Sequence, residues 1–205
     1  MRDLARERDA LAEAAARRVL AALPPGPVTA RLRLLTTAEL LCPAPPPRRP
    51  AGLCDELRAL EQAAQAAVRR RPGWLTVECG KDPLTVSAPP RLVQAAVLSV
   101  WRCALLEGTN TGACCRRAGS AAVVQLWGAS ARLLARSDAA ALLSCLARRT
   151  GGTLLLTACG PGTAVLRLPL CGGTVAPAPE PEQLLTDRYS LPHLYLAGFC
   201  AGEEP

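Results

Sequence analysis

The 205-residue sequence has no isoleucine, one lysine, one histidine and very few aromatic residues. Its net charge of +7 is therefore carried almost wholly by arginine, and few aromatic side chains lie between the arginines to stack on nucleic-acid bases. An arginine-rich nucleic-acid binder is accordingly the weakest functional interpretation. No apolar run approaches the ~20 residues of a membrane-spanning helix, so we expect no membrane contact.

The usual zinc ligands are also poorly placed. His193 is the only histidine, none of the ten cysteines forms a CxxC pair, and Cys114 and Cys115 are adjacent. A structural zinc site needs four clustered ligands, so we predict no metal site. The first twenty residues alternate charge with Ala and Leu, unlike an export signal. We therefore expect a cytoplasmic protein in which the thiols stay reduced and act as small buried hydrophobes.

Helical spacing of apolar residues dominates the first third of the chain. Two proline-rich stretches, 24–27 and 43–50, interrupt it, and we expect no regular structure there because proline lacks a backbone donor. Each predicted helix has one apolar stripe that it cannot bury alone. We therefore expect a helical hairpin over residues 1–72 that dimerises through the stripes at 3–23 and 53–68. The predicted helices span residues 3–23, 29–41 and 53–70.

From residue 73 onward, short apolar strands alternate with helices, which predicts an α/β unit over residues 73–173. The first two strands flank a turn at Gly80, and we expect a loop at 108–120. A linker rich in proline and glycine is predicted at 172–182, and a mildly apolar tail follows at 184–199. We assign residues 174–205, which hold most of the linker and the tail, to a third region. Strands are predicted at 74–79, 84–86, 121–127, 153–157 and 163–168, and helices at 91–105 and 133–149.

The stretch 139–170 runs in the order helix, GG, strand, GPGT, strand, LP. This order resembles the end of the ATP-binding domain of sensor histidine kinases. Residues 19–41 share the length and apolar frame of that family's phosphoacceptor segment, 53–60 resemble the start of its second hairpin helix, and 91–105 resemble its magnesium-binding helix. The resemblance covers most of the chain. It implies an α+β chain with an N-terminal dimerisation-hairpin remnant and a two-layer sandwich of the histidine kinase-like (GHKL) ATPase fold, with a mixed, mostly antiparallel sheet.

The residues that perform the family's chemistry are absent at the matching positions. Pro25 takes the place of the phosphate-accepting histidine, and Gly26 takes the place of the acid that follows it. Proline carries no nucleophile. His193 lies far downstream in the tail and cannot substitute. We therefore predict no catalytic residue.

The nucleotide site of the resemblance is equally altered. Leu98 and Arg102 stand where the family has two asparagines that bind Mg²⁺, although Mg²⁺ prefers oxygen ligands. Trp127 and Gly128 stand where its adenine-binding DxGxG motif begins. The glycine-rich lid is missing, and the helix that normally opens with GLGL begins near Asp138. Losing these features together, while the apolar frame persists, indicates that the fold was kept and the catalysis was not.

The sequence thus predicts a catalytically degenerate histidine kinase-like protein that is not an enzyme and needs no cofactor. Its expected role is a protein-interaction or regulatory module of bacterial two-component signalling. The expected partner is a second copy of the chain, a histidine kinase or a response regulator. The alternative is an atypical active kinase or ATP-binding protein that uses ATP and Mg²⁺, in which Arg102 contacts a phosphate directly.

Overall fold

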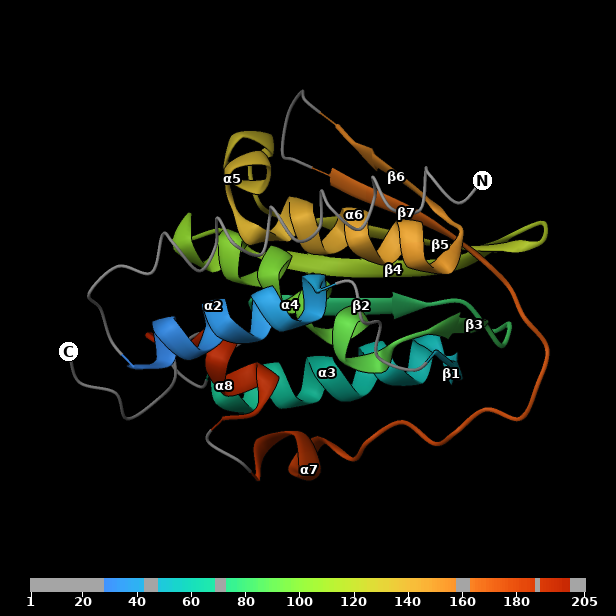
Figure 1. The fold of residues 1–205 in the computed structure, drawn as a ribbon, viewed down its shortest axis with the longest axis horizontal. Helices are drawn as coiled ribbons and strands as arrows, with labels where there is room; N and C mark the ends of the chain where they lie inside the picture. The colour runs from blue at the N-terminus through green and yellow to red at the C-terminus, as the bar shows by residue number, and fades with distance from the viewer. Residues whose placement is uncertain (1–27, 43–47, 69–72, 158–162, 187–188, 200–205) are drawn as a thin grey trace.

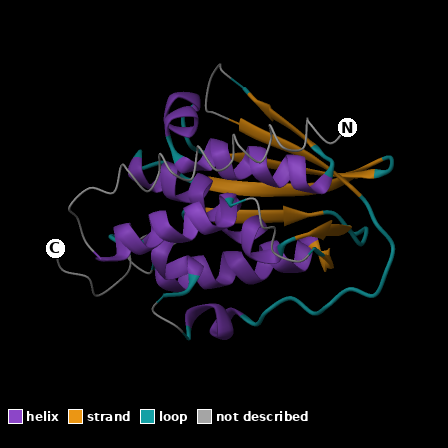
Figure 2. Cartoon of the chain, viewed as in Figure 1, coloured by secondary structure: helices purple, strands orange, loops and turns teal. Residues whose placement is uncertain are grey.

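The computed structural model describes residues 28–42, 48–68, 73–157, 163–186 and 189–199. In this part of the chain, helices gather on one side of a five-stranded sheet, and a second sheet of two strands lies near its end (Figures 1 and 2). No helix among these residues is long and apolar enough to cross a membrane. The helix predicted at 3–23, together with Pro25 and Gly26, lies outside the described residues.

Seven helices are described: α2 (Val28–Leu41), α3 (Leu53–Ala67), α4 (Pro90–Leu106), α5 (Ala131–Arg136), α6 (Asp138–Thr150), α7 (Pro181–Leu185) and α8 (Leu191–Leu196). The helices predicted at 29–41, 53–70 and 91–105 are confirmed to within a few residues. The single helix predicted at 133–149 is instead two helices, α5 and α6. Ser137 separates them because its backbone is extended and its hydroxyl accepts a hydrogen bond from the Ala139 N–H, which caps α6.

The larger sheet confirms a mixed, mostly antiparallel arrangement. Its strand order is β2-β4-β5-β7-β6, and only the β2–β4 pair is parallel. The smaller sheet pairs β1 with β3 antiparallel. The strand bounds are β1 (Arg49–Gly52), β2 (Leu75–Cys79), β3 (Thr85–Ala88), β4 (Thr111–Ala118), β5 (Ala121–Trp127), β6 (Thr153–Leu156) and β7 (Thr163–Pro169).

The loop predicted at 108–120 is wrong, because most of it is β4, which is paired on both sides. The glycines of this stretch suggested a loop, but Gly112 allows neighbouring groups to pack closely against the strand. A Cβ at Gly112 would overlap the ring of Trp127 and the carbonyl oxygen of Thr76. The strand therefore needs glycine at this point, and its pairing with β2 and β5 outweighs its weak strand propensity.

Two further expectations about the strands fail. Residues 74–79 and 84–86 do form strands, but β2 and β3 belong to different sheets and are not a hairpin. The proline-rich stretch 43–50, expected to be irregular, ends inside β1. Pro50 is tolerated there because of its position in the ladder. The Leu53 N–H donates to the Leu84 carbonyl oxygen, and hydrogen-bonded pairs alternate along β1 and β3, so the missing N–H of Pro50, opposite Ser87, falls on the side away from β3.

One hydrophobic core extends from Leu40 in α2 to Leu196 in α8, across residues 72 and 173, where we expected boundaries. Helix α3 packs on β2, β4 and the helices α4, α7 and α8, whereas α2 packs on α4, α6 and α8. The two helices are thus separate parts of one helical layer and not a hairpin. The apolar stripe of α3 is 1–2% exposed at Leu53, Leu57 and Leu60. A dimer contact through that stripe is therefore wrong, because the chain's own core already buries it.

The C-terminal tail is part of this core, as its apolar character suggested. The segment expected to be a linker ends in α7, and α8 follows and packs against α4, α3 and α2 (Figure 1). Five of the six residues of α8 are buried: Leu191, Pro192, Leu194, Tyr195 and Leu196. Helix α8 therefore contributes to the stability of the fold although it is only six residues long.

Candidate functional site

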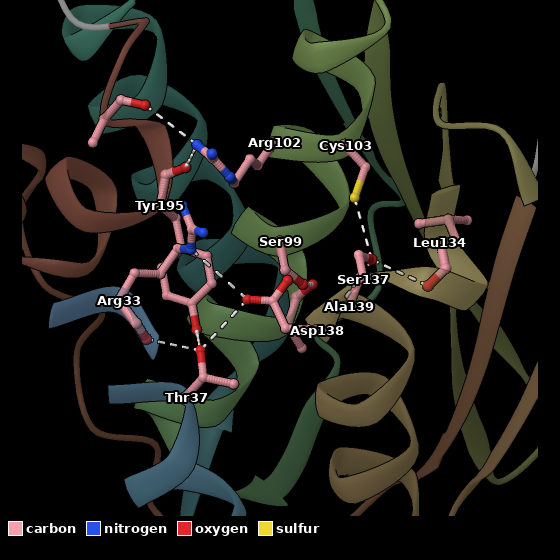
Figure 3. Close-up of polar contacts among 12 residues, drawn as sticks. Arg33, Thr37, Ser99, Arg102, Cys103, Leu134, Ser137, Asp138, Ala139 and Tyr195 are labelled. Carbon is pink, nitrogen blue, oxygen red and sulfur yellow. Dashed lines mark hydrogen bonds and ion pairs between the residues drawn. The ribbon is translucent and has the colours of Figure 1, made fainter. Parts of the chain in front are cut away.

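Leu98 and Arg102, the two α4 residues at the positions where the resemblance has magnesium-binding asparagines, face different surroundings. Leu98 is fully buried among the apolar side chains of the core. It offers no oxygen to a cation. Arg102, one turn further along α4, is half-buried and points toward the tail (Figure 3). Neither side chain carries an oxygen atom that could bind Mg²⁺.

Arg102 holds the end of α8. Its Nη1 donates hydrogen bonds to the carbonyl oxygens of Tyr195 (3.1 Å) and Ala197 (3.2 Å), and its guanidinium lies 5.7 Å from the centre of the Phe199 ring. The last carbonyls of a helix have no partner within the helix, so the arginine satisfies two of them. Burial, reinforced by the charge of nearby Arg33, lowers the pKa of Arg102 to about 10. The guanidinium still carries its charge at neutral pH.

A second polar contact joins α2 and α8 to the beginning of α6 (Figure 3). The hydroxyls of Thr37 and Tyr195 lie 2.8 Å apart, and Thr37 also donates to the carbonyl oxygen of Arg33 at 2.9 Å. The Asp138 carboxylate lies 3.5 Å from the Thr37 hydroxyl and 4.0 Å from Nε of Arg33. Burial and the nearby negative charge of Asp138 both raise the pKa of Tyr195, so its hydroxyl stays protonated.

Two of these contacts involve positions that the resemblance singles out. Arg102 stands where the resemblance expects one of two magnesium-binding asparagines, and Asp138 is the first residue of α6, the helix that follows the position of the expected phosphate-covering lid. Both now contact α2 or α8. We call this set, Arg33, Thr37, Arg102, Asp138 and Tyr195, the α8 clamp. An acid at the first turn of α6 is favourable to that helix, but it repels a phosphate.

The segment after β5 is held in place by its neighbours and carries no acid. The hydroxyl of Thr111 donates to the carbonyl oxygen of Trp127. Gly128 has φ +111°, and a Cβ there would press against the backbone of Thr111. Ser130, two residues on, donates its N–H to the Glu107 carboxylate at 2.6 Å. The nearby acid, Glu107, is thus engaged in capping contacts where the resemblance expects an adenine-binding aspartate.

Histidine and cysteine chemistry finds no support in the described residues. His193 lies with Nε2 at 3.3 Å from the carbonyl oxygen of Leu185, which ties α8 to α7. No three His, Cys, Asp or Glu side chains among these residues could hold a metal ion. Burial raises the pKa of Cys79 to about 12 and also raises the pKa of Cys103. A reactive cysteine needs a lowered thiol pKa, so these thiols behave as core side chains.

The sequence did not identify Thr37 or Tyr195 as a contacting pair, although both carry a usable signal. Each is a hydroxyl within an apolar helical stripe, and buried polar groups almost always have a partner. Two such residues, 158 positions apart, could therefore have been considered as partners. Periodicity alone does not say which of several hydroxyls pair.

No known protein-family profile matches the chain, and no curated protein matches it in sequence. Solved structures similar to it include the ATP-binding domain of PrrB from Mycobacterium tuberculosis, with 23% identity, 62% of this chain and 100% of that chain covered, and a TM-score of 0.47. The catalytic domain of the histidine kinase ThkA has 10% identity, 60% and 97% coverage and a TM-score of 0.49. The histidine kinase domain of the E. coli osmosensor EnvZ has 14% identity, 66% and 96% coverage and a TM-score of 0.47.

Proposed function

We propose that the chain is a catalytically silent relative of sensor histidine kinases that serves as a cytoplasmic protein-interaction or regulatory module of two-component signalling. The observation that carries the proposal is the α8 clamp. It covers α4 and the beginning of α6, where the resemblance places the nucleotide. The proposed role therefore needs neither ATP nor Mg²⁺, and the partner is a second copy, a histidine kinase or a response regulator.

The α8 clamp also gives an energetic reason for weak nucleotide binding. A nucleotide at these positions would have to displace α8, in which burial of each leucine and of Tyr195 is worth about 1.5–3 kcal/mol. A displacement cost of only about 4 kcal/mol would turn a micromolar Kd into a millimolar one. Without oxygen ligands at Leu98 and Arg102, little binding energy is available to offset this cost.

Thermal unfolding of the full chain with increasing Mg-ATP tests the proposal. We expect no change in Tm up to millimolar nucleotide, while an intact histidine kinase domain measured alongside rises. A Tm that increases with nucleotide concentration would contradict the proposal and support the alternative of an active or ATP-binding protein. Transfer of the γ-phosphate from ATP to the chain would contradict it as well.

A further inference from the structure

One edge of the larger sheet exposes apolar residues. Strand β6 stands at the end of the strand order, and among the described residues only β7 pairs with it. It contains no charged residue and no proline. Leu155 is 62% exposed and Leu156 is 37% exposed. Natural edge strands usually carry charges, prolines or bulges that prevent pairing with another chain, and β6 has none of these.

The outward backbone groups of β6 can be assigned from the ladder. The Thr157 N–H donates to the Thr163 carbonyl oxygen at 3.0 Å. Because hydrogen-bonded pairs alternate along an antiparallel ladder, Leu155 also points its N–H and C=O toward β7. Leu154 and Leu156 then point theirs toward the outer side. No hydrogen bond from another described residue reaches these two outward residues.

The opposite edge of the same sheet is blocked. At β2 the Glu61 carboxylate accepts a hydrogen bond from the Val77 N–H at 2.9 Å, and the Gln65 side chain donates to the Leu75 carbonyl oxygen at 2.6 Å. Both side chains come from α3. They occupy a donor and an acceptor that an added strand would need. Within the part of the chain that the structure describes, the larger sheet thus has one protected edge, at β2, and one open edge, at β6.

The open edge has a sequence that matches itself. Residues 153–157 are Thr-Leu-Leu-Leu-Thr, which is the same in both directions. In an antiparallel pair of two copies, Leu155 lies opposite Leu155 of the second copy. Leu154 then lies opposite Leu156, and Thr153 lies opposite Thr157. Every cross-strand pair therefore joins residues of the same type, and the outward groups of Leu154 and Leu156 find their partners.

We propose that two copies of the chain associate through antiparallel β6–β6 pairing about a two-fold axis at Leu155. A two-fold axis requires a self-complementary surface, which the palindromic strand supplies. The proposal rests on the interaction role proposed above and names its surface and its partner. A contact this small lies below the roughly 1,200 Å² of a standard stable interface, so the dimer is a reversible one.

The test is the mass of the full chain, measured by light scattering over a wide concentration range. The wild type should rise from one chain mass to two. Leu155→Lys and Leu155→Glu should each stay at one, because each places two like charges opposite each other at the axis. An equimolar mixture of the two variants should regain the doubled mass, since opposite charges then face each other. Leu106→Lys, at a leucine 55% exposed on α4, is the matched control and should dimerise like the wild type.

Three outcomes would overturn the proposal. The wild type could keep one chain mass at every concentration, the Leu155 variants could dimerise unchanged, or their mixture could stay monomeric. Circular dichroism of both Leu155 variants checks that they are folded, so that a monomer mass reflects lost association and not unfolding. Failure here is separable from failure of the proposed function, because a nucleotide-dependent rise in Tm would contradict the function whatever the mass.

Discussion

The surface of α4 and the start of α6 is covered by other parts of the chain, whereas the edge of β6 is not covered by any described residue. At the former, where the resemblance expects a ligand, the chain covers its own surface with α2 and α8 and fixes the cover through Arg102, Asp138 and Tyr195. At β6, where no ligand is expected, leucines are left exposed. The difference is that α8 and its polar contacts bury the surface of α4 and the start of α6, whereas no described element covers the outer side of β6.

The protection of β2 sharpens the contrast. The strands at both edges of this sheet have outward N–H and C=O groups. Among the described residues, α3 supplies polar side chains to these groups at β2, and no helix does so at β6. Glu61 and Gln65 sit on α3 at positions that reach Val77 and Leu75. The open edge at β6 is therefore a local property of the residues around it and not a general feature of the sheet.

The largest expected effect comes from opening the covered face. Tyr195→Ala removes a fully buried aromatic ring and leaves a cavity between α8, α2 and α4. We expect a loss of about 3–5 kcal/mol in the free energy of unfolding, as for other buried aromatic-to-alanine changes, measured by urea denaturation. Tyr195→Phe keeps the ring and should lose only about 1 kcal/mol. Equal stability of Tyr195→Ala and the wild type would show that α8 is not part of the core.

Arg102→Ala should weaken the cover without leaving a large cavity. It removes two hydrogen bonds to the end of α8 and the contact with Phe199. A loss of about 1–3 kcal/mol is expected, because the bonds come from a charged group. Limited proteolysis should cut the tail faster. Arg132→Ala, at an exposed arginine in the first turn of α5, is the control, and comparable losses in both variants would contradict the assignment.

Glu61→Ala should unblock the protected edge and cost about 1 kcal/mol, the worth of one hydrogen bond. It should also drive masses beyond two chains at high concentration, because the molecule then has two open edges. Glu61→Gln keeps an acceptor for the Val77 N–H and should behave like the wild type in mass. An unchanged mass distribution in Glu61→Ala would show that something else protects β2.

The same residue predicts a pH effect. Burial is the main cause that raises the pKa of Glu61, against the opposing effects of the Val77 hydrogen bond and Arg58. An acid with a raised pKa binds its proton more tightly in the folded state, so its contribution to stability falls as the pH rises from its unfolded value through its folded one. The stability of Glu61→Gln relative to the wild type should therefore increase with pH over that interval, measured by urea denaturation at each pH.

The smallest effect is expected at the open edge. Leu155→Lys should change the stability of the monomer by less than about 0.5 kcal/mol, because the side chain is already exposed. Leu166→Lys, on neighbouring β7 where the side chain is buried, should prevent stable folding. Denaturation at low protein concentration, where the chain is monomeric, provides the measurement. A large loss in Leu155→Lys would mean that this residue serves the fold and not association.

Local patterns were sufficient where one element carries its own signal. Apolar spacing predicted α2, α3 and α4, and the glycine stop at Gly151, with φ +73°, predicted the end of α6. Local patterns failed for β4. Gly112 suggested a loop, but the strand needs glycine there because the Trp127 ring occupies the space that a side chain would fill. They also failed for α3, because a leucine stripe looks the same whether it faces a partner chain or the core.

At the candidate site, the sequence by itself determined which side-chain chemistry is present: no change in packing can turn Leu98 into an oxygen ligand or give Pro25 a nucleophile. Side-chain chemistry is set by residue type. Only the tertiary structure decided which contacts form there, because the contacts of Arg102 with α8 and of Thr37 with Tyr195 join residues 93 or more positions apart. Which edge of the sheet is protected was likewise decided in three dimensions, where α3 lies beside β2 and brings Glu61 to its backbone.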